Sequence, residues 1–179
     1  MKGGNFKDYS SKQYRPLTNN EIEKHLLGLQ FIGIYPLLKD NSSYFIVADF
    51  DKDNWVEECV SFVNVCNKNG IYSYLECSQS GKGGHVWMFF EQSYPAYKSR
   101  SIVLNLLEFS GSISKFDRNV SFDRLFPNQN YLSGKGFGNL IALPLNKKFI
   151  ELGNCCFIDL NSNAYNNQWD FLISIKRNA

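Results

Sequence analysis

Apolar and polar residues alternate along the chain with two different periods, which predict both helices and strands. Thr18 and Glu21 fit a capping box that opens a helix over 19–29. One apolar face predicts a second helix over 54–68, and a third is predicted over 93–112. A closing helix is predicted over 167–178. Aromatic and β-branched runs predict strands over 44–51, 71–78, 85–91, 120–126, 139–145 and 156–160.

The order of the central elements is β-α-β-β-α-β, which predicts an α+β fold. We expect an RRM-like, split βαβ arrangement, with an antiparallel or mixed sheet and helices packed on one face. The 179 residues suit one domain, 1–179, with a polar, mobile lead-in over 1–16.

Composition narrows the function classes only slightly. The net charge of +2 lacks the strong basicity of a protein that coats DNA. No apolar run approaches the ~20 residues needed to span a bilayer, and the N-terminus has no signal-peptide core. The five cysteines lack C-x-x-C spacing, so we expect reduced, mostly buried thiols in a cytoplasmic protein and no zinc site.

Two aspartates end the predicted strand 44–51. Residues i and i+2 share a face of a strand, so Asp49 and Asp51 should lie side by side. Neighbouring carboxylates repel unless a cation neutralises them, and oxygen ligands suit Mg²⁺ or Mn²⁺. An acidic turn after a buried strand explains the same residues without a metal.

A glycine-rich turn separates the predicted strands 71–78 and 85–91, which we expect to form a hairpin. It reads Ser80, Gly81, Lys82, Gly83, Gly84 and His85. Glycines let backbone N–H groups approach an anion, and the lysine adds a positive charge. A plain hairpin turn accounts for the glycines, but not for the lysine and one of only two histidines.

A third acid is expected beside the first pair, because two-metal sites need further carboxylate ligands. Asp123 ends a short strand, and Asp117 and Asp159 compete with it for this role. Downstream, Arg124, Asn128 and Gln129 are candidates for contacts with phosphates or template, or belong to a solvated loop.

Three blocks in this order resemble the archaeo-eukaryotic primase superfamily, most closely the primase-like domain of TOTE conflict systems. The blocks are YFIVADFD, SQSGKGGHVWMFF and SFDRLFPNQN with GFGNLIALPL. The similarity runs from about Tyr14 to the closing QWDFLISIKR. It implies an RRM-like catalytic core and template-directed transfer of nucleotides by two metal ions, Mg²⁺ or Mn²⁺.

Carried over by motif, the resemblance makes Asp49 and Asp51 the first metal ligands. It places the turn residues Ser80, Gly81, Lys82, Gly83 and His85 at the phosphates of the incoming nucleotide. Asp123 becomes the third acid, preferred over Asp159 because it precedes the loop and the GNLIALPL strand. The implied partners are a DNA template or primer and an NTP or dNTP, with helicase or nuclease modules in a full system.

Two other functions use some of the same features. An RRM-like module with a vestigial acidic site would bind single strands through aromatic and basic residues. A metal-dependent nuclease would also need clustered acids, but it would not need the anion-binding turn.

Overall fold

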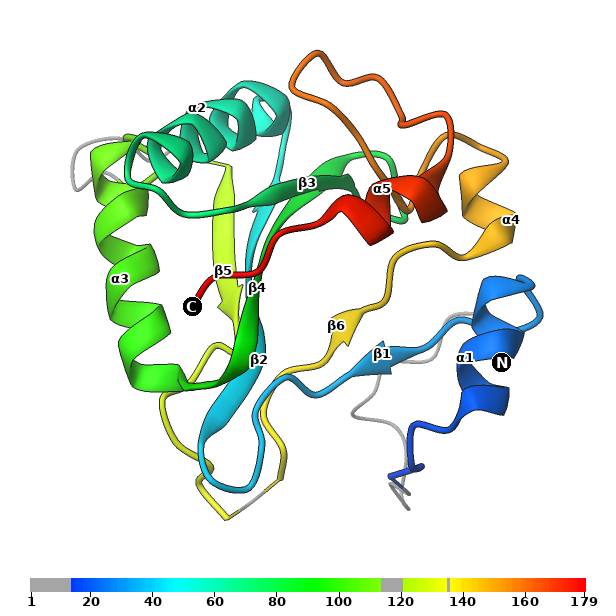
Figure 1. Cartoon of the computed structure of the whole chain (residues 1–179), viewed down its shortest axis with the longest axis horizontal. Helices are drawn as coiled ribbons and strands as arrows, with labels where there is room; N and C mark the ends of the chain where they lie inside the picture. The colour runs from blue at the N-terminus through cyan, green and yellow to red at the C-terminus, as the bar shows by residue number, and fades with distance from the viewer. Residues whose placement is uncertain (1–13, 114–120, 135) are drawn as a thin grey trace.

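A five-stranded antiparallel sheet forms the centre of the computed structural model, which describes residues 14–113, 121–134 and 136–179. The strands lie in the order β5-β2-β4-β3-β7 (Figure 1). Their bounds are β2 (Ser42–Asp51), β3 (Tyr74–Cys77), β4 (Gly83–Pro95), β5 (Phe122–Phe126) and β7 (Cys156–Phe157). Strand β4 separates β2 from β3, and β2 separates β4 from β5. The predicted split βαβ arrangement is therefore confirmed.

Two helices cover one face of this sheet. They are α2 (Trp55–Lys68) and α3 (Ala96–Phe109), which lie together on the same side in Figure 1. Alternate residues of β2, namely Ile46, Ala48 and Phe50, are fully buried against them. This face is therefore an apolar core built from strand alternation on one side and helical periodicity on the other.

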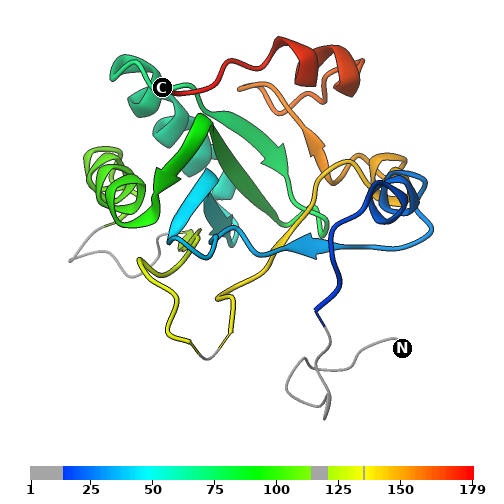
Figure 2. The same cartoon turned by 60° about the horizontal axis from the view of Figure 1, so that its bottom comes forward.

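The opposite face is covered in part by the remaining elements, so helices lie on both sides of the sheet rather than on one. These elements are α1 (Asn19–Leu26), β1 (Gly33–Ile34), β6 (Ile141–Ala142), α4 (Lys147–Ile150) and α5 (Gln168–Ser174) (Figure 2). A second apolar cluster joins Val47, Trp87 and Phe126 of the sheet to Ile141 and Leu145.

The region predicted as a strand over 139–145 differs most from the expectation. Only β6 is extended there, and it pairs with β1 in a separate two-stranded sheet. Proline at 144 has no N–H for a ladder, and Leu145 has a φ of 68°, so the strand cannot continue. The Pro144 carbonyl oxygen instead lies 2.9 Å from Nε2 of His25, which is buried in α1.

Several other elements end at different residues than predicted. The Thr18 side chain accepts a hydrogen bond from the Glu21 amide at 3.3 Å, as predicted, but the helix ends at Leu26 before Gly28 with φ 76°. The closing helix stops at Ser174, after which Asn178 pairs with the backbone of β4. Most of the predicted lead-in, 1–13, lies outside the described residues. No helix in the described part of the chain could cross a membrane.

Candidate functional site

Three carboxylates meet at one end of the sheet. Asp49 and Asp51 share the face of β2 that carries Val47, as strand alternation requires. Ligand oxygens of Asp49, Asp51 and Asp123 all lie within 4.8 Å of one another. We call these three residues the acidic cluster. Among the residues that the structure describes, it is the only such set of metal-capable side chains.

A β-bulge in β5 aims Asp123 at this cluster. Arg124 pairs with Asp49 and Phe122 pairs with Phe50, so Asp123 is an extra residue with no partner on β2. The bulge returns the Phe122 ring to the helix-covered face, where it lies 5.7 Å from the Phe50 ring. A bulge that redirects a side chain is a common device beside active sites.

Backbone contacts hold the ends of β2 and β5 together. The Asp51 amide donates to the Ser121 carbonyl oxygen at 2.8 Å. The Ser121 amide in turn donates to both carboxylate oxygens of Glu58 in α2, at 2.9 and 3.0 Å. Glu58 was not among the predicted site residues, because its contact lies 63 positions away in the sequence.

The electrostatics of the cluster favour a cation. Partial burial, together with the nearby charges of Asp49 and Asp123, raises the pKa of the Asp51 carboxyl. Arg124 offsets part of this charge, since its Nε lies 2.5 Å from Asp123 Oδ2. Three carboxylates with one exposed arginine leave net negative charge at the end of the sheet.

His85 lies next to Asp49 on the neighbouring strand β4. Its Nε2 is 3.4 Å from Asp49 Oδ1, and its Nδ1 is 2.9 Å from Glu76 Oε2. Burial lowers the pKa of His85, but the two carboxylates outweigh burial and raise that pKa to about 10. Sequence reasoning missed Glu76; a single acid inside the apolar run of a predicted strand was the available signal.

The glycine-rich turn connects β3 to β4 beside the acidic cluster. Gly81 has a φ of 70°, which favours glycine. A Cβ at Gly83 would lie 2.6 Å from the Phe50 carbonyl oxygen and 2.7 Å from Asp51 Oδ1, so only glycine allows this approach.

Not every amide of this turn is available to an anion. The Gly81 amide donates to the Ser78 carbonyl oxygen, and the Lys82 amide donates to Ser80 Oγ. The side chains of Ser80 and Lys82 are exposed. The capacity of the turn to bind phosphate therefore rests mainly on these side chains.

The other predicted residues lie elsewhere. Asn128 and Gln129 follow Phe126, which pairs with Val47, so they lie beyond the far end of β5 from the cluster. Asp159 accepts bonds from the amides of Asn161 and Asn163 within its own turn. The structure does not bring it to Asp49. Asp117 lies outside the described residues.

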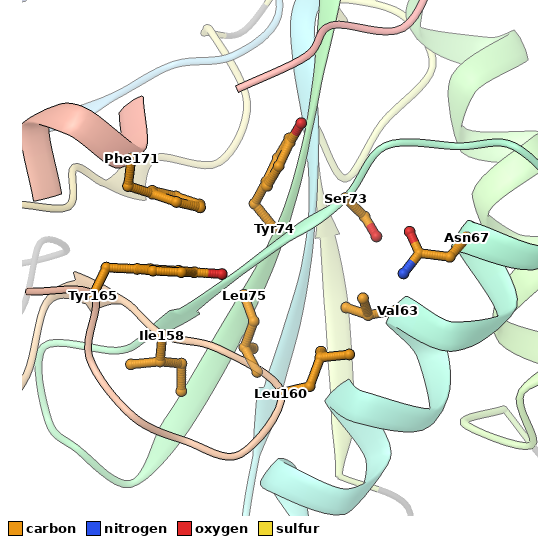
Figure 3. A pocket seen from close by; sticks show the side chains of 9 residues that line it. All are labelled: Val63, Asn67, Ser73, Tyr74, Leu75, Ile158, Leu160, Tyr165 and Phe171. Atoms are coloured by element: carbon orange, nitrogen blue, oxygen red, sulfur yellow. The ribbon is translucent and has the colours of Figure 1, made fainter. Parts of the chain in front are cut away.

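A cavity of about 230 Å³ lies at the outer edge of β3 (Figure 3). It is lined by residues of α2, of β3 and the position before it, of the loop after β7, and of α5: Val63, Asn67, Ser73, Tyr74, Leu75, Ile158, Leu160, Tyr165 and Phe171. None of the candidate site residues lines it. The chemistry-bearing residues and this cavity are therefore separate features.

All five cysteines are free and buried, as the sequence predicted. Burial raises the pKa of the Cys66 thiol to about 11 and that of Cys155 to about 12. Neither thiol is therefore a nucleophile at neutral pH.

Comparison with curated protein sequences finds no match. The sequence model of the archaeo-eukaryotic primase domain of TOTE conflict systems, in contrast, matches residues 2–179, nearly the whole chain. This is a family of primase-type nucleotidyltransferases, with nucleotides and nucleic acid as substrates. The match agrees with the mixed α+β fold and its split βαβ sheet. The chain therefore belongs to the archaeo-eukaryotic primase family, in the branch found in TOTE conflict systems.

Proposed function

We propose that this chain is a template-directed nucleotidyltransferase that adds NTPs or dNTPs to a primer, or to an initiating nucleotide, on DNA. One observation carries the proposal: the carboxylates of Asp49, Asp51 and Asp123 converge within 4.8 Å beside the glycine-rich turn. Acids next to an anion-binding turn suit a triphosphate better than they suit a plain strand-binding module.

The residues of the acidic cluster fit a divalent cation. Their donors are all carboxylate oxygens, the type that Mg²⁺ and Mn²⁺ prefer. Burial, and after it the charges of Asp49 and Asp123, raise the pKa of Asp51, and a cation would neutralise that charge. Asp49, Asp51 and Asp123 would hold the metal. When bound, it would supply charge neutralisation for the triphosphate and for the attacking hydroxyl.

The other side chains would bind and orient the nucleotide. The exposed Lys82 would supply an ammonium group from the glycine-rich turn, and Ser80 would add a hydroxyl on the same turn. His85 directs Nε2 toward Asp49 and would donate to an oxygen of the triphosphate. Arg124 holds Asp123 in place through its short ion pair and carries further positive charge.

Primer extension tests this proposal. The protein is incubated with a labelled primer on a longer template, dNTPs or NTPs, and Mn²⁺ or Mg²⁺. We expect template-dependent products that disappear in Asp49→Ala and persist in Asp159→Ala, a matched acid outside the cluster. Strand binding without extension, and without a nucleotide-dependent thermal shift, would favour a binding module. Shortening of the labelled strand without nucleotide would identify a nuclease.

A further inference from the structure

Glu76 is a buried acid that the proposed reaction does not use directly. It lies in β3, only 1% exposed, and pairs with His85 of β4, which pairs with Asp49 of β2. Three adjacent strands thus align a carboxylate, an imidazole and a carboxylate in one row. A buried carboxylate is costly unless it is paired and hydrogen-bonded, so its partners must account for its presence.

Two side chains hold Glu76 through one oxygen. Trp87 Nε1, which can only donate, lies 2.6 Å from Oε2, and His85 Nδ1 lies 2.9 Å from the same atom. Trp87 is itself buried, so it fixes the carboxylate in the sheet. A carboxylate acceptor at Nδ1 keeps a proton on that nitrogen and sets the plane of the ring.

His25, the other histidine, has backbone groups rather than carboxylates as hydrogen-bond partners. The Ile32 amide donates to Nδ1 of His25 at 3.2 Å, and Nε2 lies 2.9 Å from the Pro144 carbonyl oxygen. Backbone groups therefore hold His25 as the tautomer with its proton on Nε2. His85 has the opposite arrangement at Nδ1, and its Nε2 is turned toward the acidic cluster.

We propose that Glu76 is a positioning residue for His85, holding the ring so that Nε2–H points to the triphosphate side of the acidic cluster. Trp87 contributes indirectly, because its hydrogen bond holds Glu76 in place. The inference rests on the proposed function, because it concerns how the same site binds a nucleotide. Glu76 itself touches neither substrate nor metal.

Glu76→Gln tests this role, because glutamine keeps the shape and removes the charged acceptor. We expect kcat/KM for the nucleotide to fall by on the order of 10- to 100-fold, the usual effect of losing such an orienting partner. In a His85→Ala background the same change should cost nothing more, because Glu76 acts only through His85. An equal loss in both backgrounds would overturn the proposal.

A spectroscopic measurement separates positioning from stability. The chain has two histidines, so ¹⁵N signals of both imidazoles can be assigned. The His85 signals should move in Glu76→Gln, and by less in Trp87→Phe, while those of His25 stay in place. Glu91→Gln, the same change at an exposed site on β4, is the control. If Glu76→Gln does not fold, Trp87→Phe carries the test. Unmoved His85 signals refute the inference.

The two failures are distinguishable. Absence of nucleotide transfer by the unaltered protein would defeat the proposed function, and with it the catalytic part of this inference. The His85 signals would still decide whether Glu76 fixes the ring.

Discussion

The two faces of the central sheet perform different tasks with the same strands. On the helix-covered face, Ile46, Ala48 and Phe50 of β2 are fully buried against α2 and α3. On the other face, Asp49 and Asp51 lie at the end of β2 and are partly exposed to solvent. Along β2 the helix-covered face is therefore apolar core to the end of the strand, whereas the other face changes from the buried Val47 to like charges held at close range.

Because of this difference, substitutions on the two faces should affect stability and activity separately. Removing an acid relieves repulsion and leaves the core intact, whereas removing a core ring leaves a void. The expected effects run from complete loss of nucleotide transfer at the acidic cluster to almost no change at the buried thiols.

Asp51→Asn should abolish nucleotide transfer while the fold persists. We expect a loss of about 1000-fold or more, because the charge stabilisation that a bound metal supplies is worth several kcal/mol. The melting temperature without metal should be unchanged or slightly raised, since burial and the nearby charges of Asp49 and Asp123 oppose ionisation of Asp51. Primer extension and a melting curve measure both. A large fall in melting temperature would mean that the cluster is structural.

Phe62→Ala should give the opposite result. This ring is fully buried in α2, 5.8 Å from the Phe50 ring. Its loss should reduce the free energy of unfolding by about 3–5 kcal/mol. The rate of transfer per folded molecule should change little. Urea titration measures the first quantity, and active-site titration with activity measures the second. A loss of transfer as large as that expected for Asp51→Asn would mean that the helix-covered face determines activity as well as stability.

Mn²⁺ should stabilise the fold, by about 2.7 kcal/mol at a concentration of ~100 times Kd, and so raise the melting temperature. Without metal, the raised pKa of Asp51 favours the folded state at low pH, and this contribution is lost as pH rises through that pKa. The gain from Mn²⁺ should therefore be larger at neutral pH than in acid. Calorimetry with and without a chelator checks this; Asp51→Asn should show little gain.

Lys82→Ala should weaken nucleotide binding and leave the chemical step nearly intact. Loss of one contact to a charged group corresponds to an increase in nucleotide KM of about 10-fold. Lys68→Ala, an exposed lysine at the end of α2, is the matched control. Steady-state kinetics over a range of dNTP concentrations measure the change. An equal effect in both variants would point to general charge attraction.

Thiol alkylation should have the smallest effect. The raised pKa values of the buried cysteines predict slow reaction with iodoacetamide in the native protein and fast reaction in urea. Brief treatment should leave primer extension unchanged. Mass spectrometry counts the modified thiols, and rapid native labelling of Cys155 would contradict its burial.

Strand alternation was enough to place Asp49 beside Asp51, and the order of elements was enough to predict the split βαβ sheet. The register between strands was not available, so the row that joins Asp49, His85 and Glu76 could not be derived. A fully buried acid is rare, and the only local signal for Glu76 is that it is a single acid inside the apolar run of a strand.

The boundaries failed where tertiary contacts overrule local pattern. Apolar alternation over 139–145 favours a strand, but the short pairing with β1 and the left-handed Leu145 end it early. The choice between Asp123 and Asp159 rested on family resemblance. Physically, Asp123 reaches the acidic cluster because β5 has an extra residue, and the periodicity of the sequence does not reveal that residue.

Because of that extra residue, the site depends on the number of residues in β5 as well as on their chemical identity. Deleting one residue next to Asp123 would restore regular pleating in β5. Either the acid or the neighbouring Phe122 ring would then face the wrong side of the sheet. An engineer who grafts these three acids onto another RRM-like scaffold must therefore transplant the irregularity in the ladder along with the side chains.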